Sequence, residues 1–296
     1  LHGYAAANDP AALAEMRAIL AEEAGRLWEG IILSELDLGL IKVVLRLHET
    51  PHIDNWHIRA YGGLGLAAMA LSEHAGFPGQ GVPQDWADRA FEMVKGSLDF
   101  QIEELDGGYA EGPFYSRYAA DVYLPYMFAL KNRTGLNMFV DPKIEKMHDW
   151  SLNLRLPNGR RPNIDDGHLD DFYGHYLAGV YSDGGIHRWD WENNANGLYV
   201  RQFSEMDAIA LFDDSVQAME PTHGPSVFMS GAGDAVFRSD WSAQATYMLL
   251  RGENGVARSG GLSHEHADET SFILYAGGEM LALDAGYINF SNHDKV

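Results

Sequence analysis

Apolar residues recur at helical spacing through the first two-thirds of the chain. The first stretch follows Asn8 or Asp9, either of which can cap a helix with Pro10 in its first turn. The later helical stretches are residues 31–48, 55–74, 84–105, 112–133, 142–154, 168–181 and 195–216. Since no strand pattern separates them, they predict an all-α layer of antiparallel helix pairs.

The pattern changes after Pro221, where shorter segments alternate or run apolar with glycines between them. These segments predict antiparallel strands over 226–230, 235–241, 245–251, 271–276 and 279–284. We therefore divide the chain into a helical domain, 1–220, and the N-terminal part of a β-domain, 221–296. One hairpin and a few strands do not close a sheet core, so we expect the chain to be truncated.

Gly277 and Gly278 join the last two predicted strands, and a two-glycine joint between such strands predicts a tight hairpin turn. With a two-residue turn, Ala276 pairs with Glu279. Counting outward from that pair sets Ser271 opposite Asp284.

This register brings Asp284 to the open end of the hairpin, beside His264, His266 and Asp268. Histidines two residues apart on an extended chain point the same way. Imidazole nitrogen and carboxylate oxygen are zinc ligands, so we predict a metal or catalytic role here. The alternative is a polar hairpin mouth with solvated histidines.

Composition excludes several classes of function. The chain has 296 residues, 46% of them hydrophobic, and no apolar run approaches the roughly 20 residues of a membrane span. Its 21 basic and 43 acidic residues give a net charge of −22, which argues against a nucleic-acid partner. The absence of cysteine fits cytoplasm or periplasm. The chain starts at Leu1, and we expect any signal peptide to have been removed or to lie outside it.

Three places in the helical part carry polar groups that packing does not require. In the first, Asn55 is a predicted N-cap, and His57 follows in the first turn, where the helix dipole favours a neutral imidazole. The alternative there is a cap beside a surface histidine. The second, D-G-G-Y-A-E-G-P-F-Y-S-R-Y at 106–118, places tyrosines around Glu111 and Arg117.

The third is the loop at 156–168, where Arg160 and Arg161 are candidate carboxylate clamps. A solvated loop is the alternative. The aromatic segment 186–191, which contains Trp189, is predicted to line a sugar-binding cleft, because aromatic rings stack on sugars.

Four motifs together resemble the heparinase II/III-like polysaccharide lyases, a group with heparin, heparan sulfate and alginate lyases. They are N-W-H at 55–57, D-G-G-Y-x-E-G-P-x-Y at 106–115, P-N-I-D-D at 162–166 and H-x-H-x-D-x-x-S-F-x-L-Y-x-x-G-x-x-L-x-x-D-x-G-Y at 264–287. The resemblance implies an incomplete (α/α) toroid followed by an antiparallel β-sandwich, with the active site in the cleft between them.

The resemblance also implies roles for single residues. Asn55 matches the asparagine that neutralises the uronate carboxylate, and His57 matches an active-site histidine. Tyr115 matches the catalytic tyrosine, with Tyr118 as the alternative. His264 matches a second active-site histidine. Substrate contacts are expected from Glu111, Arg160, Arg161 and Trp189.

His266 and Asp284 match two ligands of a structural zinc ion. The third ligand, a histidine of a later H-N-T segment, is expected beyond residue 296.

The implied reaction is β-elimination on an anionic, uronic-acid-containing polysaccharide by a periplasmic or secreted enzyme. Other classes stay open. A zinc-dependent hydrolase would use His264, His266 and Asp268 to activate water. An inverting glycosidase would use acid pairs such as Asp165/Asp166 or Asp170/Asp171. A non-catalytic sugar-binding protein would keep the aromatic cleft and would lose nothing on His57→Ala.

Overall fold

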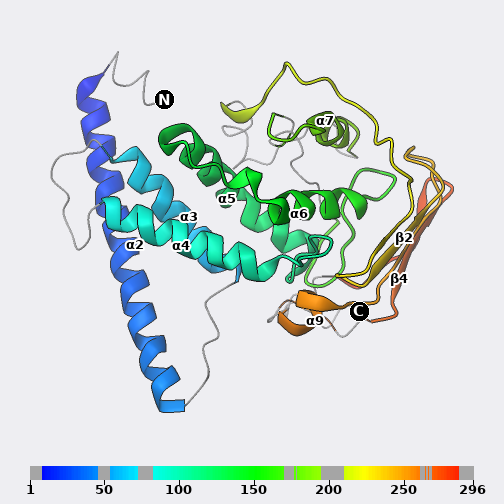
Figure 1. Ribbon diagram of the computed structural model, residues 1–296, viewed down its shortest axis with the longest axis horizontal. Coiled ribbons are helices and arrows are strands. Elements are labelled where there is room, and N and C mark those ends of the chain that lie inside the picture. Colours follow the sequence, from blue (N-terminus) through cyan, green and yellow to red (C-terminus); the bar gives the residue numbers. More distant parts are fainter. Residues whose placement is uncertain are drawn as a thin grey trace. The chain divides into compact units, whose positions relative to one another are not determined.

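The computed structural model describes residues 9–45, 54–72, 83–169, 177, 179–194, 210–260, 264, 266 and 269–286. Most helices precede the strands along the chain (Figure 1). The helices are α2 (Pro10–Leu45), α3 (Asn55–Ala70), α4 (Pro83–Gln101), α5 (Gly112–Thr134), η1 (Met138–Val140), α6 (Pro142–Asn153), α7 (Gly184–Glu192) and α9 (Gly255–Gly260). The strands are β1 (Val227–Met229), β2 (Asp234–Arg238), β3 (Tyr247–Leu250), β4 (Phe272–Ala276) and β5 (Glu279–Ala282). The fold is therefore helix-rich with an antiparallel sheet, as the hydrophobic pattern predicted.

The chain divides into two compact units. The first contains Leu1–Ser97 and Pro125–Leu136, and the second contains Leu98–Leu124 and Asn137–Val296. Helices α4 and α5 each contribute to both units. The predicted division at residue 220 rests on the change from helices to strands and stays a prediction.

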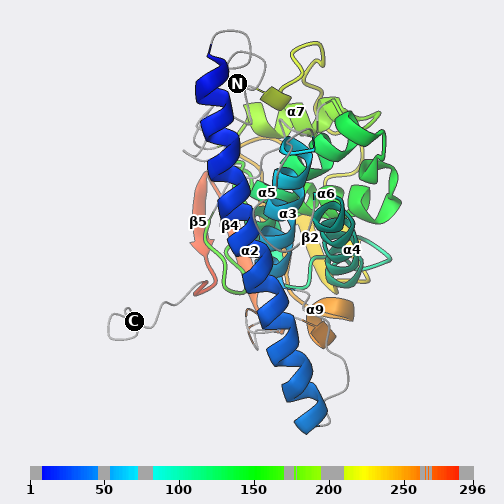
Figure 2. The same ribbon diagram turned by 90° about the vertical axis from the view of Figure 1, so that its left-hand side faces the viewer.

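Helix α2 is longer than the sequence indicated. We predicted a separate second helix from Ile31, but the helix runs unbroken from Pro10 to Leu45 (Figure 2). Gly30 lies within it, and no described atom lies within 4 Å of the position that a Cβ would take there. A single glycine costs about 1 kcal/mol relative to alanine in a helix, which does not end it.

In the first unit, α3 packs closely against its neighbours at Gly65. A Cβ built there would lie 2.2 Å from the Cε2 atom of Tyr126 in α5 and 3.0 Å from the Cβ atom of Ala90 in α4. Tyr126 and Ala90 are fully buried. Glycine at this position therefore sets the distance between three helices.

The sheet has the strand order β1-β2-β3-β4-β5, and every neighbouring pair is antiparallel. Gly277 and Gly278 both have positive φ, 63° and 82°, as the predicted turn requires. The predicted pairing of Ala276 with Glu279 is confirmed.

The predicted pairing of Ser271 with Asp284 is wrong. A register shift between Leu274 and Tyr275 places Leu274 opposite Ala282, and β5 ends there. A bulge adds one residue to one strand, so counting outward from the turn fails beyond it.

One face of the sheet is buried within the second unit. The Tyr247 hydroxyl donates to the carbonyl of Leu154 at 3.0 Å, and the Arg238 guanidinium donates to the carbonyls of Asn153 and Arg155. The sheet therefore rests on the segment that follows α6. The opposite face exposes large apolar side chains, namely Phe228, Phe237, Leu250 and Phe272.

Two predicted helices fall mostly on residues that the structure does not describe. For the predicted helix 168–181, residues 168, 169, 177 and 179–181 are described and are not helical. For 195–216, description begins at residue 210, and 212–216 are not helical. Helix α7 was not predicted, because its aromatic residues were assigned to a cleft.

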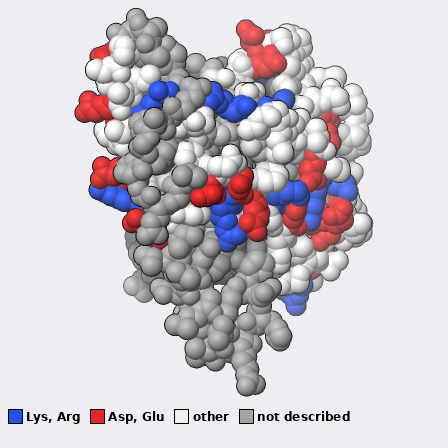
Figure 3. Space-filling view, turned by 60° about the vertical axis from the view of Figure 1, so that its left-hand side comes forward, with Lys and Arg blue, Asp and Glu red and all other residues white. Residues whose placement is uncertain are grey.

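Acidic and basic side chains lie interspersed among uncharged atoms on the face shown in Figure 3. None of the helices in the described ranges combines the length and the apolar composition needed to cross a membrane.

Candidate active site

The glycine-rich loop before α5 is held from two sides within the second unit. Gly107 has φ of 81°, and a Cβ there would lie 2.2 Å from the carbonyl carbon of Lys146 in α6. The Asp106 carboxylate accepts a hydrogen bond from the Gly231 N–H at 2.6 Å. The loop is thus fixed between α6 and the β1–β2 turn, and it sets where α5 begins.

Gly112 starts α5 against a buried ion pair. A Cβ on Gly112, whose φ is 78°, would lie 2.6 Å from Oδ2 of Asp165. Asp165 itself has a φ of 56° and is 2% exposed. Its Oδ1 lies 2.7 Å from Nη2 of Arg251, which also contacts Glu253 at 2.6 Å. Charge pairing therefore holds Asp165 in the left-handed region, which aspartate tolerates better than most residues.

Asp166 contacts both histidines of the H-x-H motif. Its Oδ2 lies 3.0 Å from Nδ1 of His264, and its Oδ1 lies 3.0 Å from Nε2 of His266. The backbone N–H of Asp166 also donates to the carbonyl of His264 at 3.1 Å. Sequence reasoning missed this role, because it considered Asp166 only as half of a glycosidase acid pair.

Tyr115 and His264 stack face to face. Their ring centroids are 3.7 Å apart, with an interplanar angle of 20°. Tyr118, one helical turn later, meets Tyr115 edge-on at 6.0 Å. Tyr115 is 8% exposed, and the His264 side chain is 14% exposed. A phenol, which can donate a proton, therefore lies against an imidazole that can accept or donate one.

Glu111 is buried behind this pair. Its Oε2 accepts a hydrogen bond from the Gln101 side-chain amide at 3.1 Å, and its Oε1 lies 3.6 Å from Nε2 of His264. His264 thus has a carboxylate near each ring nitrogen, since Asp166 faces Nδ1. The Glu111 carboxylate contacts these protein groups, so the geometry favours positioning of His264 over the predicted substrate contact.

Asn55 and His57 lie at the start of α3 in the first unit. The prediction that Asn55 caps the helix is wrong, because Asp54 is the N-cap and its side chain accepts from the His57 N–H. Asn55 is the first helical residue and is fully buried. The His57 ring lies against Asp54, with 2.5 Å between Nδ1 and Oδ1.

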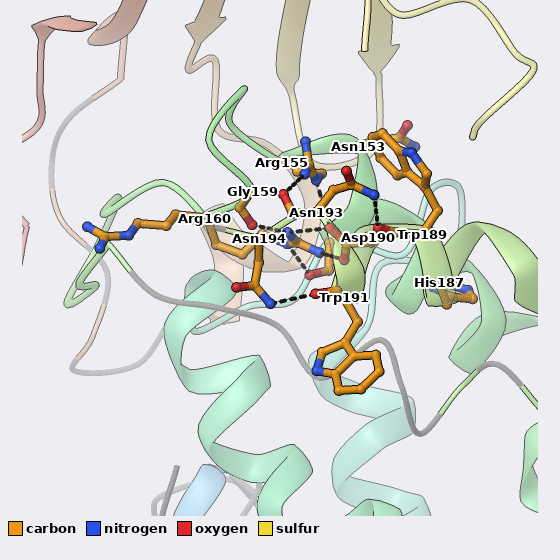
Figure 4. A network of polar contacts seen from close by, with 12 residues as sticks. Asn153, Arg155, Gly159, Arg160, His187, Trp189, Asp190, Trp191, Asn193 and Asn194 are labelled. Atoms are coloured by element: carbon orange, nitrogen blue, oxygen red, sulfur yellow. Dashed lines mark hydrogen bonds and ion pairs between the residues drawn. The ribbon is translucent and has the colours of Figure 1, made fainter. Parts of the chain in front are cut away.

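A buried cluster surrounds Asp190 (Figure 4), and its ion pair with Asp190 makes Arg161 a member of it. Its Nη2 lies 2.5 Å from Oδ2 of Asp190, and Nε of Arg155 lies 2.8 Å from Oδ1. Burial alone would raise the pKa of Asp190, but the charges of Arg161 and Arg155 outweigh burial and lower that pKa below its ordinary value. The cluster is a structural link between α7 and the segment after α6.

Arg160 and Trp189 differ in their surroundings. The Arg160 side chain points away from Asp190 (Figure 4), while the Arg160 carbonyl accepts from the Leu156 N–H in a tight turn. The guanidinium carbon of Arg155 lies 4.6 Å from the Trp189 ring centroid. Arg160, Arg161 and Trp189 were all predicted to contact the substrate. Of these three, Arg160 is therefore the one whose side chain points away from the cluster.

The predicted glycosidase pair Asp165/Asp166 splits between two sets of partners. Asp165 is buried against Arg251, whereas Asp166 faces His264 and His266. An inverting mechanism needs two carboxyl groups that flank one bond, and these two do not face a common gap. The second pair, Asp170/Asp171, lies outside the described residues.

Neither a protein-family sequence model nor a curated protein sequence matches the chain. Solved structures do match. A crystal structure of heparinase III matches with a TM-score of 0.61 and 16% identity over 79% of this chain and 35% of that chain. A second heparinase III structure matches with a TM-score of 0.54 and 17% identity over 82% of this chain and 34% of that chain.

A heparan sulfate lyase from Pedobacter heparinus, HepC, matches with a TM-score of 0.52 and 20% identity over 80% of this chain and 33% of that chain. The chain has the fold of heparinase III. It spans about a third of the length of these structures.

Within this heparinase III fold, the two predicted zinc ligands approach one loop. Asn163 donates to the carbonyl of Asp284 at 2.7 Å, and Asp166, three residues later, contacts His266. No group of three metal-binding side chains is found among the residues that the structure describes. Asp268 and residues 287–296 fall outside those residues, so the zinc site stays a prediction.

Proposed function

We propose that the chain is part of a polysaccharide lyase that cleaves a uronic-acid-containing glycan by β-elimination. The observation that carries this proposal is the stacked pair of Tyr115 and His264 on a heparinase III fold. Asp166 contacts Nδ1 of His264 and holds its ring. The phenol and the imidazole supply the proton-transfer groups that elimination requires.

The reaction needs three contributions. A base removes the C5 proton of a uronate, its electrons form a C4–C5 double bond, and the C4–O bond to the leaving sugar breaks. Hydrogen bonds to the uronate carboxylate must first stabilise the enolate-like charge, because the C5 proton is only weakly acidic. An acid then protonates the leaving oxygen. No water enters, and a 4,5-unsaturated uronate remains at the new end.

Tyr115 acts as the acid in this proposal. His264, which stacks on Tyr115, takes part in the same proton transfer. Tyr115 is preferred to Tyr118, because Tyr115 stacks on the histidine and Tyr118 meets Tyr115 only edge-on. The two carboxylates next to His264, Asp166 and Glu111, hold the ring in place.

The family resemblance assigns Asn55 to the uronate carboxylate and makes His57 an active-site histidine. We keep the role of Asn55 and propose His57 as the base. Arg160 is the arginine that we propose as a helper for the carboxylate. Arg161 forms an ion pair with the buried Asp190 at 2.5 Å. We therefore expect its removal to destabilise the fold, whatever its effect on a substrate.

We propose a glycosaminoglycan as the substrate class, since the matching solved structures are heparinase III and a heparan sulfate lyase. Alginate is the alternative uronate polymer. A net charge of −22 disfavours the most highly sulfated polymers, because like charges repel. Such a substrate is met outside the cytoplasm, so we propose a periplasmic or secreted enzyme.

The finer architecture follows from the same proposal. The helices would form an incomplete (α/α) toroid, and the sheet would be one layer of a β-sandwich. The outer sheet face supports the sandwich, since Phe228 is 71% exposed and Phe272 is 51% exposed. A second sheet that covers this face would bury both rings.

We also propose a structural zinc ion held by His266 and Asp284. The donor types fit zinc, and Asp166 would act as the carboxylate that orients a zinc-bound His266. The ion would stabilise the loop region without taking part in elimination.

Metal analysis of the purified protein tests the zinc proposal, with His266→Ala and Asp284→Ala as comparisons. Bound zinc should fall in both variants, and the melting temperature should fall with it.

The test of the function is an absorbance assay on a panel of uronic-acid polysaccharides. An unsaturated uronate absorbs at about 232 nm because its double bond is conjugated with the carboxylate, and elimination alone creates that double bond. A rise with one polymer that is lost in Tyr115→Phe and in His57→Ala supports the proposal. Release of reducing ends without that absorbance contradicts it and favours hydrolysis.

A further inference from the structure

Asp54 makes two contacts through one carboxylate oxygen. Its Oδ1 accepts a hydrogen bond from the backbone N–H of His57 at 3.1 Å, and the same oxygen lies 2.5 Å from Nδ1 of the His57 ring. The first contact caps α3, as an N-cap aspartate does. The second ties an imidazole to the cap, which capping alone does not require.

The His57 ring is bounded on another side by the next turn of α3. Tyr61 stacks near it, with ring centroids 6.4 Å apart and an interplanar angle of 24°. Tyr61 is 2% exposed, and the guanidinium carbon of Arg89 lies 6.0 Å from its ring centroid. Tyr61 therefore provides a fixed surface, and the His57 side chain retains 24% exposure toward solvent.

The contact with Asp54 selects a tautomer. An ionised carboxylate only accepts hydrogen bonds, so Nδ1 of a neutral His57 must carry the hydrogen. Nε2 then carries the lone pair. Burial alone would raise the pKa of Asp54, but its hydrogen bond and charge interaction with His57 lower that pKa below the ordinary value. Asp54 is thus ionised at neutral pH and acts only as an acceptor.

We infer that Asp54 is a positioning residue that orients His57 and holds it as the Nδ1–H tautomer, with Nε2 presented as the proton acceptor. The catalytic consequence rests on the proposed function, in which His57 is the base. The tautomer itself does not, since it follows from the contact between Asp54 and His57. Neither the N-W-H motif nor the family resemblance includes Asp54.

Two substitutions separate the cap from the imidazole contact. Asp54→Ser keeps a capping oxygen, since serine is as good an N-cap as aspartate, but its shorter side chain does not reach Nδ1. Asp54→Asn keeps an oxygen that caps the helix and accepts from Nδ1–H. Helicity and melting temperature should therefore be nearly unchanged in both variants.

The first readout is the tautomer of His57, measured by nitrogen-15 NMR on the whole chain above the pH at which imidazoles titrate, with His57→Ala to assign the signal. The Nδ1–H form should predominate in the wild type and in Asp54→Asn, and should give way to Nε2–H in Asp54→Ser. An unchanged tautomer in Asp54→Ser would overturn the inference, whether or not the chain is a lyase.

The second readout is elimination on the polymer that the wild type cleaves. Asp54→Ser should lower kcat by about tenfold or more with KM within about twofold, because proton abstraction contributes about 100-fold or more to such reactions. Asp54→Asn should recover most of kcat. A changed tautomer with unchanged kcat would overturn the assignment of His57 as base and leave the contact supported.

Discussion

Two imidazoles in this protein are held in opposite ways. His57 is held by its own helix, through Asp54 three residues before it and Tyr61 four residues after it. His264 is held by groups that are far away in the sequence, namely Tyr115, Asp166 and Glu111. The first arrangement depends on one helix start, and the second depends on the folding of the whole second unit.

This difference determines which structural changes should disrupt each arrangement. A local arrangement forms whenever its helix forms, and a change elsewhere should leave it intact. A site assembled from distant segments fails when any supporting segment shifts, since a misplacement of about 1 Å already costs catalysis about 100-fold. Substitutions that affect only one of the two arrangements therefore test this comparison.

The largest effect is expected for Tyr115→Phe. The phenyl ring preserves the stack on His264, but the proton donor is lost, so kcat should fall by about 100-fold to 10,000-fold. Tyr118→Phe is the matched control, and its kcat should stay within about fivefold of the wild type. If Tyr118→Phe is the damaged variant, the acid has been assigned to the wrong tyrosine.

Arg161→Ala should destabilise the second unit. It leaves Asp190 short of one of its two guanidinium partners, and breaking a buried pair costs about 3–5 kcal/mol. Urea unfolding measures the loss. A change below about 1 kcal/mol would be typical of a surface pair and would contradict the buried cluster.

The same cluster predicts a pH dependence. The folded-state pKa of Asp190 lies below its ordinary value of 3.8, so its ionised form stabilises the fold above that pH. This stability should be lost as the pH falls through about 4 and below. The loss between neutral and acidic pH should be smaller in Arg161→Ala, as unfolding curves across that range will show.

Asp166→Ala should disrupt the long-range site and leave the local one unchanged. Both histidines lose a 3.0 Å contact, so we expect kcat to fall by about 10-fold to 100-fold, the range for partners that orient active-site ligands. Asp240→Asn, which alters an exposed carboxylate, is the control. The NMR signals of His57 should not move, and a shift there would contradict the independence of the two arrangements.

Gly112→Ala should give the smallest effect. Its φ of 78° and the 2.6 Å approach to Asp165 make a Cβ both strained and crowded, which costs about 1–3 kcal/mol. Gly30→Ala is the matched control in α2, where no described atom is near and alanine should stabilise the helix by about 0.5–1 kcal/mol. Melting temperatures of the two variants should move in opposite directions.

Local chemistry was predictable from the sequence. The five strands lie within a few residues of their predicted bounds, and Gly277-Gly278 forms the predicted turn because both positions need positive φ. The register shift between Leu274 and Tyr275 was not predictable, since no residue pattern in β4 or β5 marks it. The length of α2 was missed because we began a second predicted helix at Ile31, directly after Gly30. A single glycine weakens a helix but does not end it.

The candidate site was predictable only in its residue types. The motifs contained His264, Tyr115 and Glu111, but their mutual contacts arise from segments brought together by the fold. The carboxylate of Asp166 was visible in the P-N-I-D-D motif, yet its two histidine partners are about a hundred residues away, with separations of 98 and 100. Asp54 was within reach of the sequence, since an aspartate before a helix start is a capping signal.

The most direct test of the central claim is to weigh the products of the enzyme by mass spectrometry. Elimination breaks the C4–O bond without adding water, so the fragment with the new non-reducing end should be lighter by one water than the same fragment released by hydrolysis. A fragment with the full mass of the hydrolysed product would show that water enters the bond-breaking step, and it would contradict the lyase assignment.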